Sequence, residues 1–214
     1  MAEKKISIKV SASIGTVSGK VIEAKKPKAV LVLAHGAGAG MDHPFMKSLA
    51  EALAEQGITT LRYNFAYMEN KKGRPDTPSV AVKTVEAAVA KAADLFPKLS
   101  ILAGGKSFGG RMSSTYVSAQ QPENVRGLVF FGFPLHRPGD PSIERAEHLY
   151  SIQQPMLFLQ GTKDTLADLT SLKKVIKKLK QPTLITFEKA DHSFKAGKEN
   201  LIPKLAEAVA KWAN

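Results

Sequence analysis

The sequence predicts an α/β fold in three layers, with a mainly parallel sheet, an antiparallel hairpin at its N-terminal end and no inserted cap domain. Runs of consecutive apolar residues recur along the chain, as expected for strands that are buried on both faces of a parallel sheet. Segments with the apolar periodicity of helices alternate with these runs. This alternation favours parallel strands that are joined by right-handed helical crossovers.

The composition limits the class of protein. A chain of 214 residues can form one domain with a substantial core, so we expect a single domain over residues 1–214. The absence of cysteine excludes a disulfide framework, a thiolate metal site and a cysteine nucleophile. Residues 1–10 lack the continuous apolar stretch of a signal peptide, and no apolar run approaches the length of a membrane span. These features predict a soluble cytoplasmic protein.

The formal net charge of +12 would suit an anionic partner such as nucleic acid. However, the densest group of lysines lies opposite apolar residues at helical spacing, which is typical of the solvated face of an amphipathic helix. These lysines are Lys173, Lys174, Lys177, Lys178 and Lys180. No aromatic residues are interleaved with them, and no nucleic-acid module is recognisable. We therefore expect no nucleic-acid partner.

The order of predicted elements follows the same alternation. The predicted strands are 5–10, 15–24, 29–34, 58–63, 99–103, 126–131, 155–160 and 183–187. The predicted helices have their apolar stripes within 45–53, 82–96, 111–121, 169–179 and 202–212. Asp42 is expected to cap the first helix, Gly57 to end it and Pro97 to stop the second. The segment 64–78 is expected to be a long polar loop, and the segment 132–150 to be irregular with one short possible helix.

One turn between a predicted strand and a predicted helix has the spacing of a nucleophile elbow. Gly105-Lys106-Ser107-Phe108-Gly109 fits the pattern G-x-S-x-G and follows an apolar run directly. Glycine at 105 and 109 removes Cβ atoms that would collide with the neighbouring chain at so tight a turn. An ordinary glycine-rich turn has the same composition. Ser107 is therefore a candidate nucleophile, and the later strand ends are the place to look for its partners.

An acid and a histidine follow two of the later strands. In an open α/β sheet, ligands collect at the carboxyl ends of the strands. Asp164 comes just after the strand 155–160, and His192 just after the strand 183–187. The order serine, aspartate, histidine is that of the α/β-hydrolases. Asp191, beside His192, is the competing candidate for the acid.

On the basis of these residues, the chain resembles the α/β-hydrolases along nearly its whole length. The loop from His35 to Gly40 and the stretch from Gly104 to Arg111 are similar to those of small bacterial serine hydrolases in the dienelactone-hydrolase-like and KANL-Tex hydrolase-like groups. Dienelactone hydrolases themselves have cysteine at the elbow, whereas this chain has Ser107. Their substrate is therefore not carried over.

The chemistry gives each candidate a role. A serine hydroxyl is a weak nucleophile at neutral pH, so His192 would take the proton of Ser107 and later deliver it to the leaving group. Asp164 would hold the imidazole in the productive tautomer and stabilise the imidazolium. The backbone N–H groups of Phe108 and of Ala37 would form the oxyanion hole. Gly38 is the alternative to Ala37.

The predicted substrate pocket is shallow and formed by loops, which suits small or short-chain acyl groups. Its expected lining residues are His35, Tyr63, Phe65, Phe133 and Phe194. For His35, hydrogen bonding that braces its loop is expected rather than catalysis.

Other polar residues receive no catalytic role. Ser113 and Ser114 are expected to pack inside a helix, and Arg111 is left between a structural ion pair and contact with a substrate anion. The remaining histidines, His43, His136 and His148, do not combine with acids at metal-ligand spacing, so we predict no metal and no other cofactor.

We therefore expect a serine hydrolase that cleaves small carboxylic esters or thioesters through an acyl-enzyme. Its partner would be a small-molecule acyl substrate, and the sequence gives no prediction of oligomeric state. The alternative is a hydrolase fold kept as a binding or scaffold module, whose basic surface would hold a protein or an anionic partner. Both remain open at this point, because a fold does not establish a function.

Overall fold

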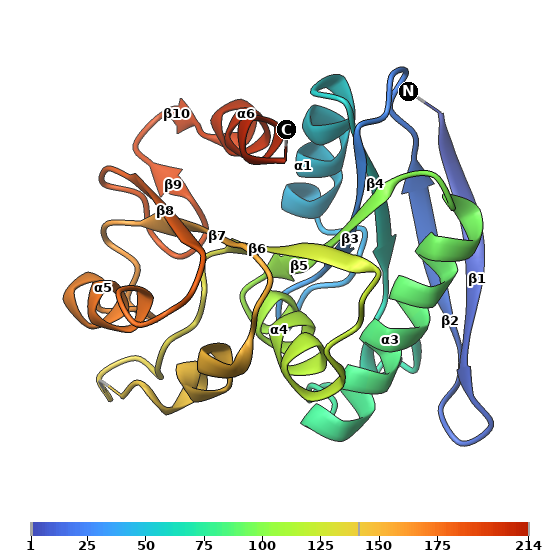
Figure 1. The fold of residues 1–214 in the computed structure, drawn as a ribbon, viewed down its shortest axis with the longest axis horizontal. Helices are drawn as coiled ribbons and strands as arrows, with labels where there is room; N and C mark the ends of the chain where they lie inside the picture. The colour runs from blue at the N-terminus through green and yellow to red at the C-terminus, as the bar shows by residue number, and fades with distance from the viewer. Residues whose placement is uncertain (1, 141, 214) are drawn as a thin grey trace.

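The structure, a computed structural model, describes residues 2–140 and 142–213, and its strands form one large sheet and one small one (Figure 1). The strands of the large sheet are β1 (Glu3–Ser11), β2 (Gly15–Ile22), β3 (Ala29–Ala34), β4 (Ile58–Tyr63), β5 (Ser100–Lys106), β6 (Val125–Phe131), β7 (Met156–Gly161) and β8 (Pro182–Phe187). Their spatial order is β1-β2-β4-β3-β5-β6-β7-β8. β2 is antiparallel to both β1 and β4, and the other pairings are parallel. The predicted mainly parallel sheet with an antiparallel N-terminal hairpin is confirmed.

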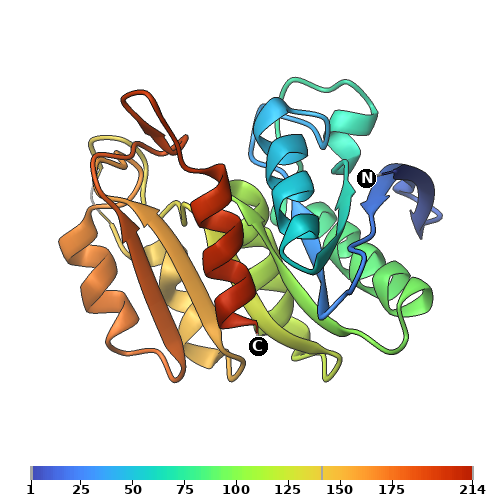
Figure 2. The same ribbon diagram turned by 90° about the horizontal axis from the view of Figure 1, so that it is seen from above.

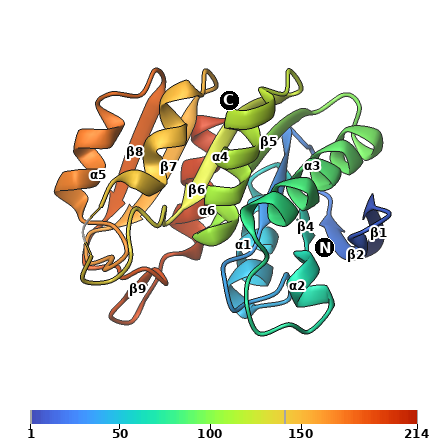
Figure 3. The same ribbon diagram turned by 90° about the horizontal axis from the view of Figure 1, so that it is seen from below.

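Helices cover both faces of this sheet. They are α1 (Pro44–Glu55), α2 (Ala66–Glu69), α3 (Pro78–Leu95), α4 (Phe108–Gln120), the 3₁₀ helix η1 (Glu144–Ser151), α5 (Leu169–Ile176) and α6 (Ile202–Trp212). Figure 2 shows α1 and α6 together on one face, and Figure 3 shows α3, α4 and α5 on the other. The result is the three-layer arrangement that the alternation of elements predicts.

The two faces of the sheet account for the uninterrupted apolar runs of its strands. In β3, Val30 and Val32 pack with α3 and α4, while Leu31 and Leu33 pack with α1 and α6. Successive side chains of a strand point to opposite faces, so a strand that is covered on both sides needs apolar residues at every position. All the residues of β3 are buried.

Some boundaries differ from the prediction. His43, not Asp42, caps α1, and its ring accepts the Phe45 N–H, while Asp42 pairs with Lys20 at 2.6 Å. The predicted loop 64–78 contains the short helix α2. The sequence pattern did not reveal α2 because it is a single turn, too short to show a periodicity.

The C-terminal part contains a further small element and a shortened helix. A two-stranded sheet, β9 (Lys195–Ala196) and β10 (Glu199–Asn200), follows β8 and was not predicted. α5 ends at Ile176, earlier than the apolar stripe suggests, although Leu179 beyond it is still buried. The five lysines in and after α5 are exposed, as a solvated face requires. None of the described helices is long and apolar enough to cross a membrane.

Candidate active site

The nucleophile elbow lies at the carboxyl end of β5. Ser107 has φ +50° and ψ −115° between the end of β5 and the first residue of α4, a strained backbone for a residue with a side chain. A Cβ on Gly105 would lie 2.2 Å from the carbonyl oxygen of Ala34, and one on Gly109 would lie 2.5 Å from that of His35. Only glycine fits these two positions, because the chain of β3 passes directly beside the turn.

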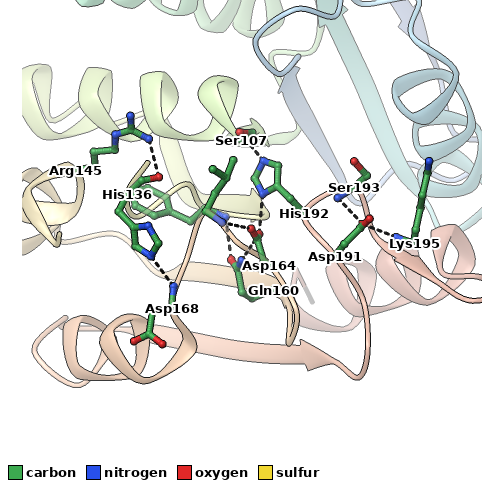
Figure 4. A network of polar contacts seen from close by, with 12 residues as sticks. Ser107, His136, Arg145, Gln160, Asp164, Asp168, Asp191, His192, Ser193 and Lys195 are labelled. Atoms are coloured by element: carbon green, nitrogen blue, oxygen red, sulfur yellow. Dashed lines mark hydrogen bonds and ion pairs between the residues drawn. The ribbon is translucent and has the colours of Figure 1, made fainter. Parts of the chain in front are cut away.

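Three side chains from separate strand ends meet at this turn (Figure 4). Nε2 of His192 lies 2.8 Å from Oγ of Ser107, and Nδ1 of His192 lies 2.7 Å from Oδ2 of Asp164. Ser107 follows β5, Asp164 follows β7 and His192 follows β8. The imidazole therefore stands between a hydroxyl that it can deprotonate and a carboxylate that can orient it.

The carboxylate of Asp164 is buried and held from several sides. Its Oδ2 accepts a hydrogen bond from Nε2 of Gln160 at 2.6 Å, and its Oδ1 accepts the Leu166 N–H at 2.8 Å. The other amide atom of Gln160, Oε1, accepts the Phe133 N–H at 3.0 Å. Sequence reasoning missed Gln160. Its signal was a polar residue at the end of the otherwise apolar run 156–159, at a position that a parallel sheet buries.

The competing acid, Asp191, forms hydrogen bonds within its own loop. Its Oδ1 accepts the backbone N–H groups of Ser193 at 2.8 Å and of Lys195 at 2.9 Å. These bonds shape the turn that carries His192, while the ring of His192 points to Asp164 (Figure 4). The structure thus brings Asp164, and not Asp191, onto the imidazole.

Two backbone segments beside Ser107 can supply hydrogen-bond donors. Phe108 is the first residue of α4, where N–H groups have no acceptor within the helix and the helix dipole favours negative charge. The loop after β3 runs alongside, since a Cβ on Gly36 would lie 3.8 Å from the Cβ of Ser107. Ala37 of this loop lines the same cavity as Ser107, whereas Gly38 does not line it and has φ +73°.

A cavity of about 580 Å³ opens at Ser107 and His192. Its lining residues come from the β3–α1 loop, the start of α1, the elbow and the loops after β7 and β8. They are Gly36, Ala37, Ala39, His43, Phe45, Met46, Lys106, Ser107, Leu166, His192, Ser193 and Lys195. Apolar residues from α1 and from the loop after β7 thus line the same cavity as Ser107, and the charged side chains in the lining are basic.

The five predicted pocket residues do not line this cavity, so that prediction is wrong for the cavity at Ser107. His35 is fully buried and braces its loop, as expected: its Nδ1 bonds the carbonyl oxygen of Gly36 at 2.8 Å, and its Nε2 accepts the Phe65 N–H at 3.1 Å. Burial lowers the pKa of His35 to about 4, so the ring is neutral at pH 7.

The four aromatic residues of that prediction are buried. Phe65 packs edge-on against Phe108 at 5.2 Å, and Phe194 stacks on Phe45 at 6.0 Å between ring centroids. Tyr63 packs against Phe65, and Phe133 packs against rings of β6 and β7. The side-chain direction at a strand end decides between core and cavity, and the sequence pattern does not encode it there.

A second serine–histidine pair lies away from the cavity. Oγ of Ser114, inside α4, lies 2.7 Å from Nε2 of His148 and also bonds the carbonyl oxygen of Arg111 at 2.9 Å. Burial, with a smaller effect from the Arg111 charge, lowers the pKa of His148 to about 4. Ser114 is fully buried. This pair ties η1 to α4, and neither residue is part of the cavity lining.

Residues 2–140 and 142–213 contain no group of three or more histidine, aspartate or glutamate side chains that could hold a metal ion.

The sheet order, the elbow and the strand-end residues define an α/β hydrolase. Residues 27–212 match the family model described as "Alpha/beta hydrolase domain", and the chain belongs to that family. The predicted resemblance to this superfamily is confirmed.

Solved structures with the same fold include small bacterial hydrolases. An alpha-beta serine hydrolase homologue from Coxiella burnetii is 21% identical, with a TM-score of 0.78 over 99% of this chain and 97% of that one. A dienelactone hydrolase from Anabaena variabilis is 18% identical, with a TM-score of 0.79 over 99% and 96%. An α/β serine hydrolase without lid from Xanthomonas campestris is 22% identical, with a TM-score of 0.75 over 99% and 95%. At these identities the likeness establishes the fold.

Proposed function

We propose that this protein is a serine hydrolase that cleaves small carboxylic esters or thioesters through an acyl-enzyme. The observation that carries the proposal is the continuous pair of hydrogen bonds from Ser107 through His192 to Asp164, at 2.8 and 2.7 Å. Ser107 lines a cavity and lies on a strained turn of the type that presents a nucleophile.

In the proposed first step, Oγ of Ser107 attacks the substrate carbonyl carbon as Nε2 of His192 takes the hydroxyl proton. Asp164 keeps the proton on Nδ1 of the ring and stabilises the imidazolium that forms. The negative oxygen of the tetrahedral intermediate accepts hydrogen bonds from the backbone N–H groups of Phe108 and Ala37. When the intermediate collapses, the imidazolium protonates the departing alcohol or thiol, and the acyl group remains on Ser107.

In the second step a water molecule takes the place of the leaving group. His192 removes its proton as the water oxygen attacks the acyl carbon, and the acid product leaves when the proton returns to Oγ of Ser107. The overall reaction consumes one water molecule per bond cleaved and requires no other reactant. The same residues therefore serve both halves of the reaction.

We further propose that the acyl group is small rather than a long chain. Phe45, Met46 and Leu166 give the cavity an apolar wall beside Ser107. We also propose that residues 1–214 form one catalytic domain without a cap over this cavity.

Covalent labelling tests the proposal. A fluorophosphonate probe is expected to modify the purified protein once, on Ser107, with the modified peptide identified by mass spectrometry. Ser107→Ala should abolish labelling. Ser114→Ala is the matched control, because Ser114 also bonds a histidine but is buried in α4, and this variant should label like the parent. A folded protein that the probe does not modify would contradict the proposal and favour a binding or scaffold module.

A further inference from the structure

Arg111, one turn after the elbow serine in α4, carries a charge that no described residue neutralises. Its backbone N–H bonds the carbonyl oxygen of Ser107 at 3.1 Å. Its guanidinium, however, forms no ion pair and no hydrogen bond with residues 2–140 or 142–213. The side chain is half-buried and does not line the cavity at Ser107. The structural ion pair, one of the two roles that the sequence left open for Arg111, is therefore absent from this part of the chain.

Two hydrogen bonds fix how α4 and η1 pack against each other. Oγ of Ser114 lies 2.7 Å from Nε2 of His148, and Oγ of Ser118 lies 2.8 Å from Oγ of Ser151. The second contact is four residues further along α4 and three residues further along η1. The two helices therefore run in the same direction, and their contacts repeat about once per turn of each helix.

One turn before the first of these contacts, two arginines lie opposite each other. Arg111 is three residues before Ser114 and Arg145 is three residues before His148, and residues at this spacing share a face of their helix. Burial, together with the nearby charge of Arg145, lowers the pKa of Arg111. Nη1 of Arg145 donates to the carbonyl oxygen of His136 at 3.1 Å, which holds that guanidinium in place (Figure 4).

The carboxylates of η1 do not neutralise this pair of arginines. Glu144 and Glu147 are exposed, and they share a different face of the 3₁₀ helix from Arg145, because residues three apart are aligned there. Arg145, like Arg111, forms no ion pair with the described residues. Two like charges that face each other across a helix contact repel, and an anion between them removes the repulsion.

We propose that Arg111 and Arg145 form a site that binds a phosphate group between α4 and η1. The planar donor pairs of two guanidiniums match the oxygens of a phosphate, and its double negative charge balances both arginines. The ligand is inorganic phosphate or the phosphate monoester of a small organic molecule, because both present the same oxygens. The site lies outside the cavity at Ser107, since neither arginine lines that cavity.

NMR titration with sodium phosphate at about pH 7 tests the site, with sodium chloride keeping the ionic strength constant. Backbone N–H resonances of α4 and η1 should shift and reach saturation in the parent. Arg111→Gln and Arg145→Gln should each weaken binding about tenfold or more, because each removes charge-assisted hydrogen bonds to the anion. Arg126→Gln is the matched control, since it removes the same charge from an exposed position in β6. It should bind phosphate like the parent.

Phenyl phosphate distinguishes the two sources of the phosphate group. Tighter binding of phenyl phosphate than of inorganic phosphate assigns the site to an organic monoester, and equal or weaker binding assigns it to free phosphate. In both cases the loss in the Arg111 and Arg145 variants supports the site. None of these measurements depends on ester hydrolysis, so they are independent of the proposed function.

Two results overturn the inference. One is a shift that grows with phosphate without saturating in the parent, and the other is equal binding by Arg111→Gln and Arg126→Gln. If Arg111→Gln is unfolded by circular dichroism, Arg111→Lys takes its place, because it keeps the charge and removes the planar fork. The folded Lys variant should bind phosphate more weakly than the parent, and parental binding by it would also contradict the site.

Discussion

Gln160 and His192 bond the same carboxylate oxygen of Asp164, at 2.6 and 2.7 Å. The two donors approach from different strand ends, because Gln160 lies in β7 and His192 in the loop after β8. A carboxylate that accepts two hydrogen bonds on one oxygen is fixed in direction. Gln160 thus helps to set the position from which Asp164 orients the imidazole.

Replacing Gln160 tests this arrangement. Gln160→Met keeps the approximate volume but removes the donor to Asp164 and the acceptor of the Phe133 N–H. We expect kcat/KM for 4-nitrophenyl acetate to fall on the order of tenfold, and stability to fall by about 1–3 kcal/mol because a buried N–H loses its partner. Ester hydrolysis and urea unfolding measure the two effects. If kcat/KM and stability both matched those of the parent, the hydrogen bond from Gln160 would have no part in positioning Asp164.

The acid can be assigned by a pair of substitutions. Asp164→Asn should lower kcat on the order of ten-thousandfold, because an amide in that place favours the wrong imidazole tautomer. Asp191→Asn should have a far smaller effect, since Asn can still accept the loop N–H groups that Asp191 binds. Both are measured by steady-state hydrolysis of the same ester. A larger loss in Asp191→Asn than in Asp164→Asn would exchange the two roles.

The elbow glycines should be far more sensitive than a surface glycine. In Gly105→Ala the new Cβ would meet backbone atoms of β3 at 2.2 Å, and neither chain can move away without breaking the sheet. We expect a loss of more than about 4 kcal/mol, or no folded protein at all. Gly73→Ala, where a Cβ meets nothing within 4 Å, is the control and should stay within about 0.5 kcal/mol of the parent. Urea unfolding decides, and equal stabilities would contradict the packing described for the elbow.

Acid should destabilise the protein through His35. Its pKa is about 4 in the folded state against an ordinary value of 6.5, because burial disfavours the charged ring. Stability from the neutral ring is therefore fully present above pH 6.5 and is lost as the pH falls towards 4, by up to about 3 kcal/mol. Unfolding free energies at pH 7 and 4.5 should differ less in His35→Gln than in the parent. An equal difference in both proteins would assign the acid sensitivity to other groups.

The sequence predicted the meeting of the three strand-end residues because their placement follows from topology. Ser107, Asp164 and His192 each stand just after a strand of a parallel sheet, and such positions converge whatever the details of the loops. The glycine pattern of the elbow added the strain that distinguishes Ser107 from other serines. The positions of the strands and helices could also be predicted from the sequence, because burial on two faces and helical periodicity leave clear patterns.

The pocket wall could not be predicted in this way. Phe65 and Phe133 lie two residues beyond the ends of β4 and β6, yet both are buried in the core, while Phe45 and Met46 reach the cavity from the start of α1. These directions depend on loop conformations and on the contacts of each ring, which no periodicity describes. Gln160 was missed for a related reason, because its importance comes from neighbours that are distant in the chain.

Hydrolysis of 4-nitrophenyl acetate by the parent, Ser107→Ala and Ser114→Ala tests the central claim most directly. We predict a rate loss on the order of a millionfold in Ser107→Ala, to what binding and the oxyanion hole supply alone, and a near-parental rate in Ser114→Ala. Parental turnover by folded Ser107→Ala would contradict it.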